Sequence, residues 1–305
     1  MNFDSLEYFS ALAQERSFTR AAELLHITQQ SLSSHIAGLE KELNCQLVVR
    51  RIPLELTYAG KTFLRYAEDI RRLQHTMQQE LCDISQNQKG ELRVGIAFTR
   101  SHAILPRIIT AFQQEYPQVA VTLTETTNST LQKLVIDGTI DLAIGEFSKT
   151  SPEIAAEPFY DERIVLCISK ELLTRCNIDF AANEAAMRGG DLRALQNCPF
   201  VLGTSEGIAG RIGREMLHRT GIRPIIRAYS ENLETLLSLC EKGVGACFSP
   251  ENLLHTSLSE EQLHQMYILC FDEGASYPIR FGYLRRPYQW SIIQEFIRVA
   301  REYPG

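Results

Sequence analysis

The sequence predicts an α/β protein in three parts: a small helical module ending in a β-hairpin, one long helix, and a larger region of alternating strands and helices. Residues 17–43 have the apolar spacing of two short helices joined by a tight turn. Residues 58–86 carry apolar side chains at nearly heptad spacing. From residue 91 onward, short strands alternate with helices, which is typical of a parallel sheet covered on both faces.

The composition is that of an ordinary globular protein. The chain has 305 residues, enough for two or three domains. Its formal net charge of −6 does not indicate nucleic-acid binding. No apolar run reaches the roughly 18 residues that a membrane span needs, and no signal peptide precedes the first predicted helix. The eight cysteines show neither CxxC nor Cys/His zinc spacing. We therefore predict a cytoplasmic protein with reduced thiols, no bound metal and no cofactor.

The first three helices should form one small core. Helix 1 is predicted from Ser5 to about Gln14, opened by a capping box at residues 4–7. Ser17 is a good N-cap for a second helix, and Thr28 for a third. The third helix places Leu32, Ile36, Leu39 and Leu43 on one apolar stripe, and the opposite stripe holds Gln30, Ser33, Ser34, Ala37 and Lys41. Such a polar face suits contact with base edges, although any amphipathic helix pair in a bundle shows the same periodicity.

Two further elements follow the helical module. Residues 46–57 predict a two-stranded wing with Arg50 and Arg51 at its tip, reaching phosphate or the minor groove; the alternative is a solvated hairpin. The helix from Tyr58 to about Gln86 is too long to bury itself on so small a domain, so we expect it to pair with a second copy. Alternatively it packs on its own C-terminal domain. Residues 86–90 then break the pattern and predict a hinge.

The order of motifs in residues 18–60 is more specific than their periodicity. TQQSLSSHIAGLEKEL, followed by two arginines and LTYAG, resembles the N-terminal region of the LysR-type transcriptional regulators. The matching positions are Ala21, Ala22, Leu25, Thr28, Gln29, Leu32, Ser33, Ile36, Leu39, Glu40, Leu43, Leu47, Arg50, Leu56, Thr57, Ala59 and Gly60. The chain departs from the family pattern at Gln30, Ser34 and residues 52–53, so the operator sequence is not predicted.

The resemblance implies a bacterial, sequence-specific regulator whose winged helix-turn-helix reads a dyad-symmetric operator on double-stranded DNA. It also implies a homodimer through the linker helix, a homotetramer, and RNA polymerase as a further partner. The domains would be residues 1–58, the linker helix and hinge 59–89, and an effector-binding domain 90–305. That domain would have two lobes, about 90–162 with 267–305 and about 163–266, and would resemble periplasmic solute-binding proteins. The expected DNA contacts are Thr28, Gln29, Gln30, Ser33, Ser34, Lys41, Arg50 and Arg51.

Ligands of two-lobed α/β domains bind beyond the carboxyl ends of the strands. Several polar residues there should lie at or near helix N-termini, which favour an anion, so a small carboxylate is the expected effector. The predicted effector-binding residues are Thr99, Arg100, Ser101, Asn128, Ser129, Glu146, Phe147, Gly203, Thr204, Ser205 and Phe248. The alternative for each Ser, Thr or Asn is that it merely caps its helix.

Two rival functions must be weighed. Residues 203–207 match the G-x-S-x-G elbow of serine hydrolases, with Ser205 as nucleophile. No His follows Asp272, the only Asp after Ser205, so the usual order Ser, Asp, His is impossible, although a Glu could substitute ahead of His218, His255 or His264. No glycine-rich oxyanion loop precedes the elbow, and an enzyme would leave the wing and the paired helix unexplained, so we expect no enzyme. The second rival keeps DNA binding but senses redox state through Cys198. No second cysteine lies within the next forty residues, which disfavours a reactive pair.

Overall fold

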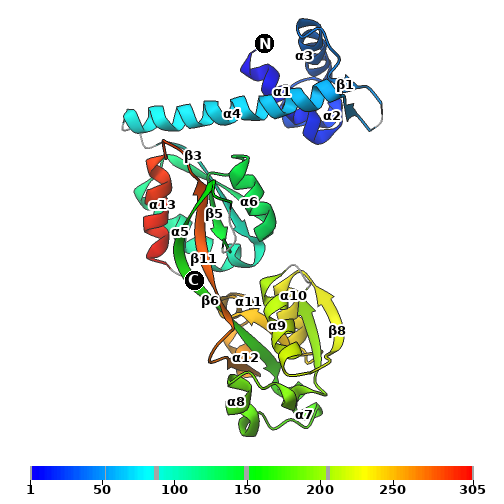
Figure 1. Ribbon diagram of the computed structural model, residues 1–305, viewed down its shortest axis with the longest axis vertical. Helices are drawn as coiled ribbons and strands as arrows, with labels where there is room; N and C mark the ends of the chain where they lie inside the picture. Colours follow the sequence, from blue (N-terminus) through cyan, green and yellow to red (C-terminus); the bar gives the residue numbers. More distant parts are fainter. Residues whose placement is uncertain (1, 52, 86–88, 148–150, 204–206, 304–305) are drawn as a thin grey trace. The chain divides into compact units, whose positions relative to one another are not determined.

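The structure is a computed structural model of the whole chain. It describes all residues except 1, 52, 86–88, 148–150, 204–206 and 304–305. For Thr99 it describes the backbone but not the side chain. The chain divides into two compact units, residues 1–87 and 88–305 (Figure 1). Each unit has its own buried core, so each is described by itself.

The first unit begins with three helices that share one core. They are α1 (Phe3–Glu15), α2 (Phe18–Leu24) and α3 (Gln29–Glu42), and the buried residues include Phe9, Leu12, Leu32 and Ile36. Ser17 and Thr28 cap α2 and α3 as predicted. The predicted capping box of α1 was wrong, because the Asn2 side chain accepts the Ser5 N–H and the helix starts two residues earlier.

A short hairpin and a long helix complete this unit. Strands β1 (Val48–Val49) and β2 (Glu55–Leu56) pair antiparallel, which confirms the predicted wing. Helix α4 (Tyr58–Ile84) follows at once. Thr57 joins the two elements: it caps α4, and its hydroxyl donates to the carbonyl of Gln46 at 2.7 Å. A Cβ on Gly60 would lie 2.0 Å from the Leu47 carbonyl oxygen, so only glycine lets α4 approach the wing this closely.

The second unit contains one mixed sheet with strand order β10-β6-β11-β5-β3-β4, and β9 also pairs with β6. In its first lobe, β3 (Gly90–Ala97) pairs parallel with β4 (Val119–Thr126) and β5 (Leu142–Gly145). Helices α5 (Phe98–Glu115) and α13 (Ser291–Arg301) lie on one face of this sheet, and α6 (Asn128–Ile136) lies on the other (Figure 1). The buried face of α13 includes Phe296, which packs against Phe112 of α5.

Two long antiparallel strands, β6 (Ile154–Ser169) and β11 (Ser276–Leu284), run from the first lobe into the second (Figure 1). The second half of β6 pairs with β9 (Cys247–Pro250) and β10 (Met266–Cys270). Strands β7 (Pro199–Gly203) and β8 (Ile225–Ser230) pair parallel. The helices of this lobe are α7 (Lys170–Arg175), α8 (Phe180–Arg188), a 3-10 turn (Arg193–Leu195), α9 (Ile208–Arg219), α10 (Leu233–Glu241), α11 (Glu251–Ser257) and α12 (Glu260–His264).

Three sequence-based expectations need correction. The sheet is mixed and not wholly parallel, because β6 and β11 cross between the lobes and pair antiparallel. Thr99, Arg100 and Ser101, expected beyond the end of a strand, lie within the first turn of α5, because β3 ends at Ala97. Strand β10 pairs with β6 residues 165–169 and so lies in the second lobe, whereas the boundary near residue 267 assigned nearly all of it to the first.

Candidate DNA-binding surface and effector cavity

The outward face of α3 is polar and open to solvent. Its inward stripe, Leu32, Ile36 and Leu39, is buried, which turns the opposite side outward. Gln29, Gln30, Ser34 and Lys41 are exposed there, Ser33 is half-buried, and Thr28 uses its hydroxyl to cap the helix. Leu43, expected on the apolar stripe, is 38% exposed because α3 ends at Glu42. Side chains of this kind can exchange hydrogen bonds with base edges.

Arg50 extends from the wing to α3. Its Nη1 lies 3.4 Å from the Ser33 hydroxyl, and its guanidinium stands 5.5 Å from the Phe18 ring centroid. Glu40 lies 4.0 Å from Arg50 Nη2, and the Glu40 carboxylate also accepts the backbone N–H groups of Leu47 and Val48 at 2.7 and 3.2 Å. Glu40 therefore joins α3 to the wing, and Arg50 is held beside the polar face.

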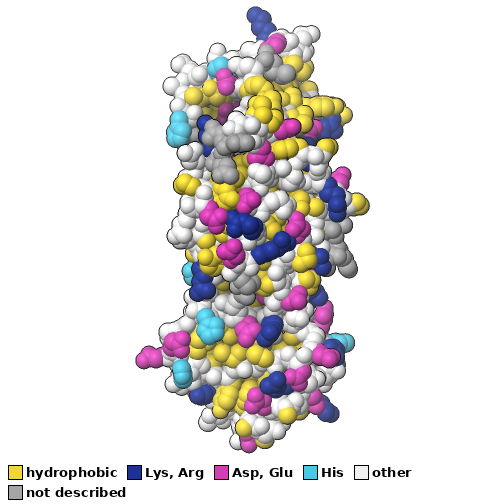
Figure 2. Space-filling model, turned by 90° about the vertical axis from the view of Figure 1, so that its left-hand side faces the viewer, with side chains coloured by type: hydrophobic (Ala, Val, Ile, Leu, Met, Phe, Trp, Pro, Cys, Tyr) yellow, Lys and Arg dark blue, Asp and Glu magenta, His cyan; other side chains and the backbone are white. Residues whose placement is uncertain are grey.

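Arg51 is the second arginine of the wing. It forms an ion pair with Glu55 across the hairpin, and both side chains are at least half exposed. An exposed pair of this kind is weak, so the guanidinium can exchange its partner for a phosphate at little cost. On the face of the molecule shown in Figure 2, basic and acidic side chains are interspersed, which agrees with the net negative charge.

The second unit has a cavity of about 150 Å³ between its lobes. Its first-lobe wall is polar, and its second-lobe wall is mostly apolar. The first wall consists of Ala97, Phe98, Arg100, Thr126, Thr127, Asn128 and Tyr277; the second consists of Gly203, Gly207, Ile208, Ala209, Gly210, Glu231, Leu233 and Pro250. This set includes the first turns of α5, α6, α9 and α10, so the partial positive charge of four helix N-termini faces the cavity.

Side chains cap only two of these four helices. Thr127 caps α6 and Asn232 caps α10 by accepting a backbone N–H. The N-cap residues of α5 and α9 are Ala97 and Gly207, and neither provides a side-chain cap. Among the described side chains none caps the first backbone N–H groups of α5 and α9, which is the arrangement that binds anions at helix N-termini.

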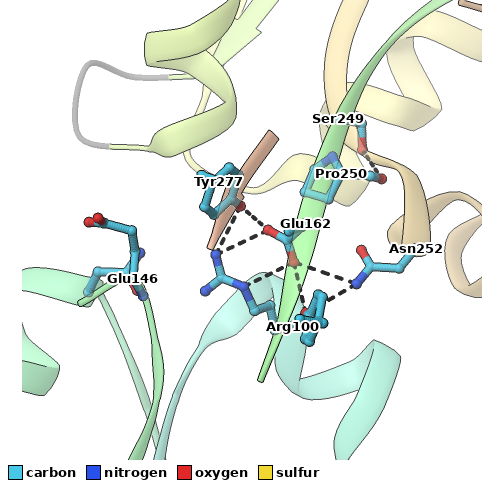
Figure 3. A network of polar contacts seen from close by, with 9 residues as sticks. Arg100, Glu146, Glu162, Ser249, Pro250, Asn252 and Tyr277 are labelled. Carbon is cyan, nitrogen blue, oxygen red and sulfur yellow. Dashed lines mark hydrogen bonds and ion pairs between the residues drawn. The ribbon is translucent and has the colours of Figure 1, made fainter. Parts of the chain in front are cut away.

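Arg100 and Tyr277, which line the cavity, belong to a buried ionic network (Figure 3). Arg100 is only 2% exposed, and its Nε and Nη2 donate to the two Glu162 oxygens at 3.0 and 3.1 Å. Nη2 also donates to the Tyr277 hydroxyl at 2.9 Å, and that hydroxyl donates to Glu162. The third nitrogen, Nη1, is buried without a hydrogen-bond partner among the described residues. Figure 3 shows it on the side of the guanidinium away from Glu162.

Glu162 joins both lobes and both crossover strands. It lies on β6 and receives hydrogen bonds from Arg100 of α5 and Tyr277 of β11. Asn252 of α11 reaches the same carboxylate at 3.5 Å, and Tyr160 donates to it at 3.0 Å. Burial raises the pKa of Tyr160, and the negative charge of Glu162 raises it further, so this phenol keeps its proton. A substitution at Arg100 would therefore change contacts of the two crossover strands, β6 and β11, that join the lobes.

Only some of the predicted effector-binding residues line the cavity. Arg100, Asn128 and Gly203 line the cavity, and Asn128 also accepts the Glu146 backbone N–H at 3.0 Å. Ser101, Phe147 and Phe248 are buried, Ser129 is exposed, and Glu146 is half-buried; none of these five belongs to the cavity wall. Thr204 and Ser205 lie outside the described residues, as does the side chain of Thr99.

Sequence reasoning missed Glu162 and Tyr277. Glu162 sits in the charged run Asp161-Glu162-Arg163, in which no residue stands out. The alternation of a strand provided one usable signal, because Glu162 lies on the same buried face as Ile164 and Leu166. A carboxylate on an apolar face needs a partner, and a nearby arginine would have been the expected one.

The cysteines bear on the redox alternative. Cys198 is fully buried, and burial raises the pKa of its thiol to about 12, with the neighbouring Cys176 raising it further. The reactive species is the thiolate, so this thiol is protonated and unreactive at neutral pH. In the described part of the chain, no group of three His, Cys, Asp or Glu side chains is placed to hold a metal ion. No helix in that part could span a membrane.

Comparison with known proteins decides the family. A family model for bacterial regulatory helix-turn-helix proteins of the lysR family matches residues 3–61, and a model for the LysR substrate binding domain matches residues 85–304. The chain belongs to the LysR family. It is a LysR-type, DNA-binding transcriptional regulator with an effector-binding domain.

Three relatives match this LysR-type regulator over more than nine-tenths of their length. The uncharacterised HTH-type regulator YcgK of Bacillus subtilis is 28% identical and covers 99% of this chain and 94% of its own. CatR of Pseudomonas putida is 28% identical, and the match covers 92% of this chain and 91% of CatR. IlvY of Escherichia coli is 25% identical, and the match covers 98% of each chain. The crystal structure of full-length CbnR with its target DNA superposes with a TM-score of 0.66 at 23% identity, covering 99% of both chains, which shows the same fold.

Proposed function

We propose that this LysR-type regulator binds an operator through the outward face of α3 and the arginines of the wing. The observation that carries the proposal is the solvent-exposed polar face of α3 with Arg50 held beside it. Gln29, Gln30, Ser33 and Ser34 contact bases, and Thr28, Lys41, Arg50 and Arg51 contact the sugar-phosphate backbone or the minor groove. The family assignment favours this role over the hydrolase alternative.

Helix α4 provides the surface for a second copy. It spans roughly 40 Å at 1.5 Å per residue and has exposed apolar residues along its length, Tyr66, Leu73, Met77, Leu81 and Ile84. Pairing along α4 would join two modules and present two α3 helices to half-sites about one helical turn, ~34 Å, apart. We propose a homodimer through α4 that assembles into a homotetramer in the bacterial cytoplasm and contacts RNA polymerase at its promoters.

The cavity between the lobes is the proposed effector site. Its anion-favouring features, Arg100 Nη1 and the uncapped N-termini of α5 and α9, support a small carboxylate as the effector. Glu162 connects this site to both crossover strands, so a ligand that binds one lobe arrangement more tightly than the other would shift the equilibrium between them. The change in arrangement would then alter how the DNA-binding modules are held.

The test is a binding measurement on DNA selected from a random duplex library with the full-length protein. Replacing Gln30→Ala should weaken binding to the selected sequence by ~1–3 kcal/mol, because one good base contact contributes about this much discrimination. Binding to unselected DNA should change little. As a matched control, Gln14→Ala alters a glutamine of α1, outside the polar face of α3. Equal losses on both DNAs would mean that Gln30 contacts only the backbone.

A further inference from the structure

The two walls of the effector cavity differ in charge. The first-lobe wall holds Arg100, and the second-lobe wall holds Glu231, which is exposed. These are the cation and the carboxylate that line the cavity in the described part of the chain. The remaining lining residues are hydroxyl, amide or apolar groups. The ligand therefore meets a hydrogen-bond donor, Arg100 Nη1, at one end and a carboxylate at the other.

Arg100 can take one carboxylate and no more. Its Nε and Nη2 are occupied by Glu162 and Tyr277, so only Nη1 is left to donate to a ligand. Because Glu162 already balances the guanidinium charge, this end offers a ligand one N–H donor and the N-terminus of α5, and a second ligand carboxylate would find no donor left there. A buried charge without a partner is costly, so one carboxylate is the limit at this end.

The opposite wall disfavours a second carboxylate. The uncapped N-terminus of α9 carries about half a unit of positive charge, but Glu231 carries a full negative charge on the same wall. The balance there is negative. Ile208, Leu233 and Pro250 make the rest of this wall apolar, which suits a hydrocarbon body. A cavity of about 150 Å³ holds a molecule of about the size of benzene, which sets the size of the ligand.

We propose that the cavity selects small monocarboxylates with an apolar body over dicarboxylates of the same length. The carboxylate binds Arg100 Nη1 and the N-terminus of α5, and the apolar body lies against Ile208, Leu233 and Pro250. Glu231 excludes a second negative charge. This inference rests on the proposed effector site, but it does not depend on which DNA the regulator reads.

The experiment compares four five-carbon probes on the full-length protein by thermal shift and calorimetry: pentanoate, glutarate, pentanamide and pentylamine. A ligand that binds only the folded state raises its melting temperature. Pentanoate should bind at least about tenfold more tightly than glutarate, a ratio that corresponds to about 1.4 kcal/mol. Pentanamide and pentylamine should bind more weakly than pentanoate, since neither offers a carboxylate to Nη1.

Two variants at exposed glutamates make the test specific. Glu231→Gln removes the negative charge of the second wall and should bring glutarate within about threefold of pentanoate. Glu234→Gln is the matched control: it lies three residues away on α10, its side chain is 50% exposed and pairs with His102, and it does not line the cavity. It should leave the probe ratio unchanged. Neither substitution breaks a buried contact, so both variants should fold.

Several outcomes would overturn the inference. They are glutarate binding as tightly as pentanoate to the unaltered protein, pentanamide binding as tightly as pentanoate, no probe binding at all, or equal changes in the two glutamate variants. Operator binding by the same protein samples, measured without probe, separates this inference from the proposed function. Intact operator binding beside any of these outcomes would overturn only the charge selection.

Discussion

Each unit of the molecule contains an arginine that pairs with a glutamate, but one pair is exposed to solvent and the other is buried. In the DNA-binding unit, the side chain of Arg50 is 52% exposed and approaches Glu40 at 4.0 Å. In the effector domain, the side chains of Arg100 and Glu162 are 3% and 1% exposed and pair through two hydrogen bonds. The first pair lies in water and can be exchanged for a phosphate, whereas the second is desolvated and holds its geometry.

This difference matches what each unit has to do. A surface that reads DNA needs charged groups that can leave their protein partners when a duplex arrives. A cavity that recognises a small anion needs groups already in place, because an ordered donor loses little conformational freedom on binding. The exposed Arg50 suits the first task and the buried Arg100 suits the second.

The largest difference in stability between the two units should appear when each arginine is replaced by alanine. Arg100→Ala leaves the Glu162 carboxylate buried without its cation, and we expect it to lower the free energy of unfolding of the effector domain by ~3–5 kcal/mol. Arg50→Ala removes an exposed partner and should cost the DNA-binding unit less than ~1 kcal/mol. Hydrogen exchange read by mass spectrometry reports the two units separately. Similar losses in both units would show that burial does not distinguish the pairs.

The two units also differed in how far their sequence predicted them. In the DNA-binding unit the signals were local: the caps Ser17 and Thr28 and the stripe of α3 lie within one stretch of 27 residues. They predicted α2 and α3 correctly, and the pattern of residues 46–57 predicted the wing. The errors concerned ends, at Asn2 and Leu43, because a cap or a last turn depends on one or two residues that several positions could provide.

In the effector domain the alternation of strands and helices was predicted, but the polar network was not. Arg100 and Glu162 are 62 residues apart, and Glu162 and Tyr277 are 115 residues apart. Their contact depends on β6 and β11 crossing between the lobes, which no local pattern specifies. The strand ends were predicted approximately, so Arg100 and Asn128 were found as residues near them, but which of the residues near strand ends face the cavity depends on tertiary packing.

A smaller effect should come from Glu40, which connects α3 to the wing. Glu40→Ala removes the acceptor of two backbone N–H groups, at Leu47 and Val48, and should destabilise the DNA-binding unit by ~1–3 kcal/mol. Glu40→Gln keeps a carbonyl oxygen as acceptor and removes only the charge, so it should restore most of this stability. Denaturant unfolding followed by hydrogen exchange in residues 1–57 measures both. If the two variants are equally destabilised, the charge near Arg50 and not the backbone contact is what Glu40 contributes.

The smallest effect concerns Arg51, whose ion pair with Glu55 is exposed. Arg51→Ala should change the free energy of unfolding by less than ~1 kcal/mol. Its effect should appear instead in the salt dependence of operator binding, where losing one phosphate contact lowers the slope of log affinity against log salt by about 1. Arg193→Ala is the matched control, because Arg193 also forms an exposed ion pair, with Asp191, lies in the effector domain and is not among the predicted DNA contacts. Anisotropy titrations at several salt concentrations give both slopes. An unchanged slope for Arg51→Ala would mean that the wing tip stays off the phosphates and that Arg50 alone carries the contact.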